Sequence, residues 1–146
     1  GLVIIGGALT HTSVALRDAL DQPAETVSTG QSLRIEVSLC ASRPIRQPTL
    51  RIGIERLDGL LCHATSSREL TLLPDGFSGN ATVRVEYPTL NLLPNVYQVT
   101  VEAFEADNPI PLACLRQGRF FQVTSDRDEQ GTVHLEHRWQ LDGVRG

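Results

Sequence analysis

The sequence contains 146 residues, 40% of them hydrophobic and 21% charged, which is the size and composition of one globular domain with its own core. Its 13 basic residues are all arginine and stand against 17 acidic ones, for a net charge of −4 at pH 7. This balance argues against nucleic acid as a partner, because phosphate binding needs a concentrated positive surface, and the absence of lysine excludes a Walker A loop.

Membrane insertion and metal binding are not predicted. No apolar stretch approaches the roughly 20 residues needed to cross a bilayer. The three cysteines, Cys40, Cys62 and Cys114, cannot all pair within one chain and show no CxxC or Cys/His spacing. Reduced thiols in a cytoplasmic protein explain them most simply, so we expect neither a metal nor another cofactor.

Alternation of apolar and polar residues is the main pattern along the chain. The apolar run at residues 2–5 is predicted to be a strand or a piece of linker, since it is too short for a signal peptide. From residue 32 to 39 every odd position is apolar and every even one polar, as in a strand with one buried face. The pattern recurs at residues 50–55, 81–87, 97–103, 121–123 and 133–136. Seven or eight strands are expected.

Turn residues separate these strands. Asp58-Gly59 is the best hairpin candidate, because both residue types tolerate the positive φ of a type I′ turn. Residues 67–73 are compatible with a helical turn or with a loop. Strands at this spacing predict an all-β, immunoglobulin-like antiparallel β-sandwich, and without repeats or linkers we expect a single domain over residues 1–146.

The segment from Leu92 to Tyr97 is typical of the corner in immunoglobulin-like sandwiches, where a tyrosine entering a strand hydrogen-bonds back across the turn. Asn95 stands where glycine is usual, and asparagine is among the few residues that accept a left-handed backbone cheaply. We therefore predict a structural role for Tyr97.

Two acidic and histidine-rich stretches near the end do not make convincing metal sites. Residues 126–131 begin like a calcium loop, but Gln130 and His137 fall where oxygen ligands are required. His134 and His137 would point to opposite faces of a strand, so one sheet surface cannot present both. A solvated loop is the favoured interpretation of this region.

A polar sheet surface is the remaining candidate for function. If the apolar residues of the third and sixth strands face the core, the polar residues between them point outward, and the two strands are commonly neighbours in such sandwiches. We expect Arg119 and His63, on flanking strands, to extend this surface. Its central residues are Arg51, Glu55, Gln98, Thr100, Glu102 and Phe104.

Such a surface suits a sugar chain, because aromatic faces pack against sugar CH groups while planar Arg and Glu groups hydrogen-bond neighbouring hydroxyls in pairs. A solvated sheet face, or one that docks another protein, has the same composition. A hydrolase would need two carboxylates at catalytic separation, and Glu55 with Glu102 is the one pair to nominate. Binding without catalysis is the preferred hypothesis. Trp139 shares strand parity with Val133 and Leu135, which favours core packing or a subunit interface over sugar stacking.

An ordered set of short motifs resembles the C-terminal domain of the Wzt ATPase subunit of O-antigen polysaccharide ABC transporters. The resemblance runs from about Ser13 to Trp139 and depends on the order of the pieces, each of which is short. The pieces are residues 29–35, Arg43-Pro44-Ile45, Gly53-Ile54, Asp58-Gly59, residues 92–97 and residues 131–135.

This resemblance implies a domain that is fused, in the full protein, to an N-terminal nucleotide-binding domain absent here. It implies binding of O-antigen polysaccharide, partnership with the transporter permease and nucleotide-binding domain, and a cytoplasmic place at the inner membrane. It also implies a homodimer with exchanged terminal strands, which would use Val133, Leu135 and Trp139 as its interface.

Overall fold

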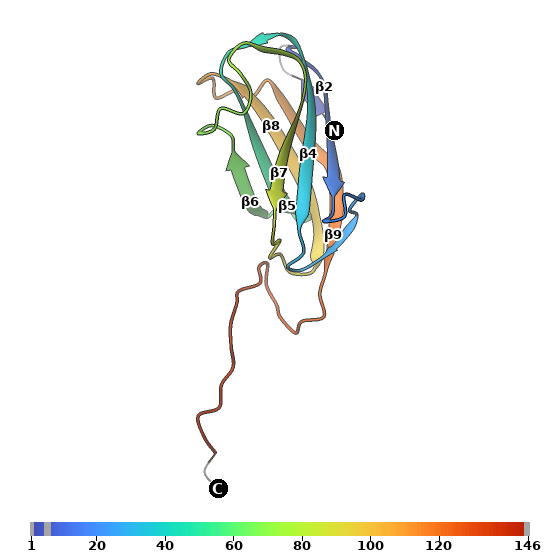
Figure 1. Ribbon diagram of the computed structural model, residues 1–146, viewed down its shortest axis with the longest axis vertical. Helices are drawn as coiled ribbons and strands as arrows, with labels where there is room; N and C mark the ends of the chain where they lie inside the picture. Colours follow the sequence, from blue (N-terminus) through green and yellow to red (C-terminus); the bar gives the residue numbers. More distant parts are fainter. Residues whose placement is uncertain (1, 5–6, 145–146) are drawn as a thin grey trace.

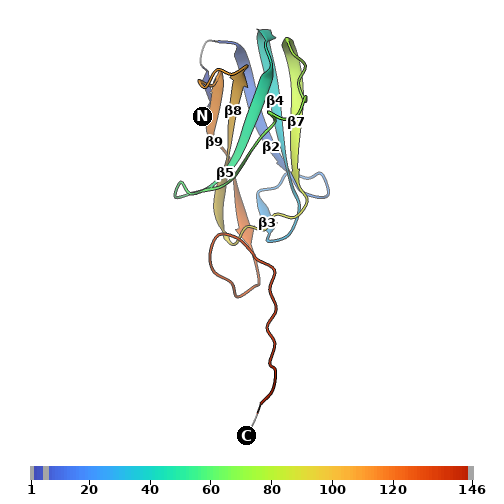
Figure 2. The ribbon, with the colours of Figure 1, turned by 90° about the vertical axis from the view of Figure 1, so that its left-hand side faces the viewer.

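The protein, described by a computed structural model over residues 2–4 and 7–144, is built from strands that form two facing sheets (Figures 1 and 2). The predicted all-β sandwich is confirmed. Nine strands are present among the described residues, against the seven or eight expected, and the N-terminal segment predicted as a strand or a linker forms one of them. They are β1 (Leu2–Ile4), β2 (Leu9–Arg17), β3 (Thr26–Ser28), β4 (Leu33–Ile45), β5 (Pro48–Arg56), β6 (Leu61–Ser66), β7 (Phe77–Tyr87), β8 (Asn95–Glu105) and β9 (Ala113–Thr124).

The larger sheet has the order β1-β9-β8-β5-β6, with β3 added to β9 in parallel, and the smaller sheet has the order β2-β4-β7. All other strand pairs are antiparallel. The two sheets stand face to face in Figure 2. Strands β5 and β8 are neighbours, as the sandwich prediction required.

The core lies between the sheets and is formed by the inward residues of each alternating strand. On β4 the four odd positions from Leu33 to Leu39 are at most 4% exposed, while the residues between them are half-buried. Strand β8 follows the same rule, with Val99 and Val101 buried. Period-two alternation therefore sets which face of each sheet remains free.

The predicted tyrosine corner is present. The Tyr97 hydroxyl donates a hydrogen bond to the Leu93 carbonyl at 2.5 Å, and its ring stacks on Phe121 with centroids 5.5 Å apart. Burial raises the pKa of Tyr97, as expected for a phenol inside the core. Asn95 does not use the left-handed backbone that asparagine accepts: it begins β8 outside the positive-φ region, and its side-chain oxygen accepts a hydrogen bond from the Val96 amide.

The hairpin between β5 and β6 exists, but its turn is not type I′. Gly59 has φ of 93°, whereas Asp58 does not adopt positive φ, and the Gly59 amide donates to the Arg56 carbonyl at 2.8 Å. This is the longer hairpin connection in which one left-handed glycine follows a type I turn. Residues 67–73 form a turn, closed by the Leu70 amide on the Ser67 carbonyl, and not a helix.

The predicted strand at residues 133–136 is wrong. Val133 makes one isolated bridge to Leu92, and the residues after it extend away from the sandwich without strand pairing (Figure 1). Trp139 is 93% exposed, which excludes the core packing considered for it. Residues 133–136 do alternate in the sequence, but no strand among the described residues pairs with this segment. Residues 2–4 and 7–144 contain no helix that could cross a bilayer.

Candidate functional site

Strands β5 and β8 bring the predicted polar residues together on the outer face of the larger sheet. Residues directly opposite in an antiparallel pair share a face, and their side chains interact. The register places Thr49 opposite Phe104, Arg51 opposite Glu102, Gly53 opposite Thr100, and Glu55 opposite Gln98. The six central residues predicted for this surface therefore lie on one face, as expected from the inward burial of Ile52, Ile54, Val99 and Val101.

In the middle of this face no side chain projects from β5, because position 53 is a glycine. A Cβ at this position would lie 2.6 Å from the Thr100 hydroxyl oxygen, closer than real side chains approach. The glycine thus lets Thr100 lie flat over β5. The Thr100 hydroxyl and the Leu61 side chain, whose Cδ1 would be 3.5 Å from such a Cβ, therefore form the surface here, with larger polar side chains toward both ends of the strands.

An open cleft of about 680 Å³ lies at one end of this face. Arg51 and Glu102 line it together with Phe104, which is half-buried. No hydrogen bond or ion pair within the described part of the chain holds either Arg51 or Glu102, although they sit opposite each other. A free guanidinium and a free carboxylate beside an aromatic ring are therefore available to a ligand.

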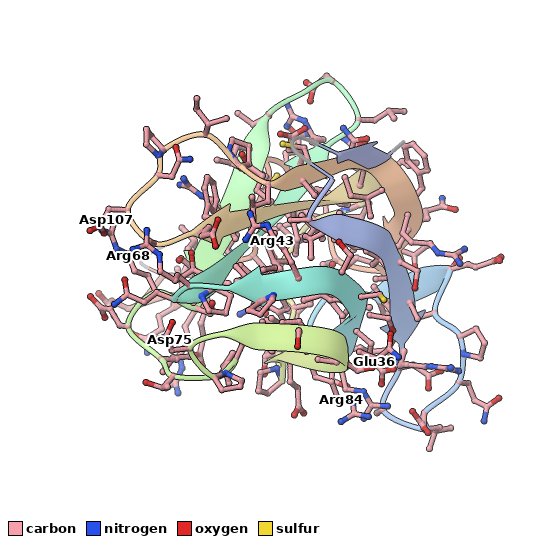
Figure 3. The ribbon with its side chains drawn as sticks, turned by 90° about the horizontal axis from the view of Figure 1, so that it is seen from above. Glu36, Arg43, Arg68, Asp75, Arg84 and Asp107 are labelled. Carbon is pink, nitrogen blue, oxygen red and sulfur yellow. The ribbon has the colours of Figure 1, made fainter. Side chains whose placement is uncertain are left out.

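Two loops form the rim of the cleft, one after β6 and one after β8. Arg68 and Asp107 project toward each other across the rim, with their nitrogen and oxygen 3.2 Å apart (Figure 3). Both side chains are highly exposed, so this pair contributes little to stability. It shows that the two loops meet at the rim of the cleft.

The loop after β8 is fixed by a stronger contact at its base. Arg43 on β4 donates two hydrogen bonds, of 2.9 and 3.0 Å, to the two carboxylate oxygens of Glu105, and the Arg46 amide donates a third. The next residue, Ala106, has φ of 49°, and its amide donates to the Arg46 carbonyl. This network ties the cleft loop to the other sheet.

These hydrogen bonds, chiefly those from the Arg43 guanidinium, lower the pKa of Glu105 from 4.5 to about 2. A carboxylate with a lowered folded-state pKa stabilises the fold above its unfolded pKa, and the contribution is lost as pH falls toward the folded value. We predict that stability decreases between about pH 4.5 and 2, and that Glu105→Gln is less stable at neutral pH with a shallower decline. Urea denaturation from pH 7 to 2 measures both.

Asp58 also has its pKa lowered to about 2, by Arg56, so the decline in the Glu105 variant is reduced and not abolished. Asp107→Asn is the matched control, because its pair with Arg68 is exposed to water. If the stability of Glu105→Gln fell with pH in parallel with that of the unmodified chain, the hydrogen bonds from Arg43 would not be the cause of the pH dependence.

The opposite end of the same face carries a residue that the sequence analysis missed. Phe120 on β9 lies opposite Gln98 and is 45% exposed, whereas its neighbour Phe121 faces the core at 1%. Gln98 donates a hydrogen bond to Glu55 at 3.2 Å, and its own side-chain oxygen is buried without a donor from the described residues. The sequence could have indicated an exposed ring here, because two consecutive phenylalanines in a strand point to opposite faces and one of them must face outward.

Two residues predicted to extend the surface do not join it. His63 lies opposite Ile54, so it points inward from edge strand β6, and its Nδ1 lies 2.9 Å from the Tyr87 hydroxyl of the other sheet. Arg119 lies opposite Val99, and its Nε donates to the Val14 carbonyl of β2 at 2.8 Å. Both residues were predicted to face outward, and both predictions are wrong. The alternation within β6 and β9 did not show which face of the sheet each side chain occupies.

Three charged residues on the outer face of the smaller sheet, Arg34, Glu36 and Arg84, already have partners. Glu36 on β4 accepts from Arg84 on β7 at 3.3 Å, seen from above in Figure 3, and Arg34 pairs with Asp21. On the larger sheet, Arg51 and Glu102 have no such partner among the described residues, and they stand beside an aromatic ring. This makes the cleft the better candidate for a ligand site.

No group of three metal-ligating side chains occurs in the described ranges. His134 instead contacts Glu129, with its Nδ1 2.7 Å from a carboxylate oxygen, and this contact lowers the pKa of Glu129. The His134 amide also donates to the Asn91 carbonyl. These two contacts hold His134 against the sandwich, and the chain extends away after it.

The fold and this cleft define an immunoglobulin-like β-sandwich domain with an open polar site on one sheet. Residues 7–135 match the model of the Wzt C-terminal domain family, and the chain belongs to that family. The crystal structure of a Wzt C-terminal domain has the same fold, with a TM-score of 0.75 at 16% identity, over 97% of this chain and 87% of that one.

A second solved structure, the CARDB domain of the PF1109 protein from Pyrococcus furiosus in complex with di-metal ions, gives a TM-score of 0.46. Its sequence identity is 10%, over 82% of this chain and 97% of that one. Comparison with curated proteins gave no significant match.

Proposed function

We propose that this domain binds O-antigen polysaccharide without covalent chemistry and so gives substrate recognition to the ABC transporter that exports the polymer across the inner membrane. The proposal is supported by membership of the Wzt C-terminal domain family. The observation that carries it is the cleft in which Arg51 and Glu102 have no partner within residues 2–4 and 7–144, beside the half-buried Phe104 ring.

The charges of this face favour a hydroxyl-rich ligand over a strongly ionic one. Arg51 is accompanied by Glu55 and Glu102 on the same face, so neither sign of charge accumulates. A guanidinium presents several donors in a plane and a carboxylate presents two acceptors, which matches neighbouring sugar hydroxyls that both donate and accept. A nucleotide or polyanion would instead require clustered positive charge.

Hydrolysis is a poor alternative for the two carboxylates nominated from the sequence. Glu55 lies opposite Gln98, and Gln98 is four residues from Glu102 on β8, so the backbone positions are separated by about 13 Å along the sheet. Glycosidase carboxyl groups lie roughly 5–9.5 Å apart. One carboxylate oxygen of Glu55 also accepts a hydrogen bond from Gln98.

The expected partners follow from the family. In the full protein the domain would be joined to the nucleotide-binding domain and would work with the permease, at the cytoplasmic side of the inner membrane. We further propose a homodimer that uses the exposed extended segment containing Val133, Leu135 and Trp139. Two glycan sites on one dimer would raise the effective affinity through local concentration.

Alanine at Arg51, Glu102 and Phe104 together is expected to weaken binding of the source organism's O-polysaccharide by about tenfold or more, because the ring contact and both charged hydrogen-bonding groups are lost. Isothermal titration with purified polysaccharide measures this. The matched control is alanine at Thr82, Arg84 and Glu86, which are exposed on β7 of the other sheet.

Equal affinity of the unmodified domain for unrelated glycans would contradict specific recognition. Unchanged glycan binding in the cleft variant, with the fold intact by circular dichroism, would place binding elsewhere and favour a protein-docking role for this face. Loss of binding in the β7 control alone would move the site to the smaller sheet.

A further inference from the structure

Two aromatic side chains stand at opposite ends of the outer face of the larger sheet. Phe104 lies opposite Thr49 at the cleft, and Phe120 lies opposite Gln98 at the far end. Phe120 is 45% exposed, although a ring of this size is normally covered in a folded domain. Its exposure is fixed by the fold, since Phe121 takes the inward position and stacks on Tyr97.

The distance between the two ends follows from the strand geometry. Gln98, which marks the position of Phe120, and Phe104 are six residues apart on β8, which corresponds to about 20 Å. This length exceeds a disaccharide and requires a ligand that is extended. It also runs along the long axis of the sandwich, in the direction of β8 in Figure 1.

The surface between the two rings is suited to a continuous ligand. Gly53 has no side chain, so the middle of the path is formed by Thr100 of β8 and Leu61 of β6, which lie over it, and no side chain of β5 projects there. Hydrogen-bonding groups occur on both sides of this middle part, with Arg51 and Glu102 toward Phe104 and with Glu55 and Gln98 toward Phe120. Each end therefore combines one aromatic ring with polar groups, the combination that orients a sugar.

We propose that the glycan site is a linear track along β8 with two aromatic subsites, Phe104 at the cleft and Phe120 at the opposite end, so that the domain binds an extended internal or terminal segment of several sugars. This inference depends on the proposed function, because it specifies the length and direction of the glycan on that same face.

The test uses the 146-residue chain and two size fractions of the source organism's O-polysaccharide, one shorter than the track and one several repeats long. The unmodified chain is expected to bind the long fraction more tightly per chain end. Phe120→Ala should lose about tenfold for the long fraction and leave the short fraction unchanged, while Phe104→Ala should weaken both. Phe120→Tyr keeps the aromatic ring and is therefore expected to bind the long fraction more tightly than the short one, as the unmodified chain does.

The outcomes separate this inference from the proposed function. If the unmodified chain binds neither fraction, the proposed function fails. If both fractions bind, and Phe104→Ala weakens binding of the long fraction while Phe120→Ala does not, the glycan is bound only at the Phe104 end. The proposed track is then wrong. Equal loss for both fractions in Phe120→Ala would also overturn it, since a short ligand would then occupy the Phe120 end.

Discussion

Alanine in place of Phe121 is expected to lower the free energy of unfolding by about 3–5 kcal/mol. The ring is 1% exposed and stacks on Tyr97 with an interplanar angle of 23°, so its removal leaves a cavity against the ring that forms the tyrosine corner. Because single domains are stable by about 5–15 kcal/mol, this is a large part of the total. Urea denaturation followed by far-ultraviolet circular dichroism measures this loss.

Phe120→Ala is the matched control, since it removes the same side chain one residue away on the opposite face. We expect it to cost about 1 kcal/mol or less, because the ring is half-exposed. If the Phe121 variant does not fold, Phe121→Leu provides a smaller, measurable loss. Similar losses at positions 120 and 121 would contradict the face assignment on which the proposed track depends.

Removal of the residues after His134 is expected to convert a dimer into a monomer. The segment projects from the sandwich with Leu135 70%, Trp139 93% and Leu141 78% exposed, and exposed apolar residues in an extended segment favour pairing with another chain. Ending at His134 keeps the Leu93 amide on the Thr132 carbonyl, so the sandwich itself is not disturbed. Sedimentation equilibrium measures the change in mass.

The matched variant for this segment replaces the polar residues Glu136 and Arg138 with alanine and leaves the apolar ones in place. It is expected to remain dimeric, and Leu135→Ala with Trp139→Ala is expected to behave as the truncated chain does. A monomeric unmodified chain at high concentration, or a truncated chain that still dimerises, would show that this segment is not the interface.

Sequence patterns predicted the central strands and their inward faces well. Alternation at residues 32–39 and 97–103 was correct because one face of each strand packs against the opposite sheet, and burial there selects apolar residues at every second position. The corner at Tyr97 was also predictable, since a buried phenol must donate its hydrogen bond locally.

Prediction was less successful where parity depends on a neighbouring strand. His63 and Arg119 have polar side chains that were assigned outward, but the register of β6 on β5 and of β9 on β8 turns both inward at the edge of the sandwich. There they satisfy the Tyr87 hydroxyl and the Val14 carbonyl. A polar residue at a sheet edge can do this because water and polar groups meet there, whereas the same residue in mid-sheet could not.

By itself the sequence determined that this chain forms a two-sheet sandwich with a polar face on β5 and β8, because strand period and turn residues are local properties of the chain. Only the tertiary structure decided which polar groups are left without partners. In the part of the chain that the structure describes, Arg51 and Glu102 have no partner, while Glu36 and Glu105 accept from arginines distant in sequence. Phe120 is exposed because Phe121 fills the core. Pairing of this kind depends on which strands are brought side by side, and alternation carries no information about that.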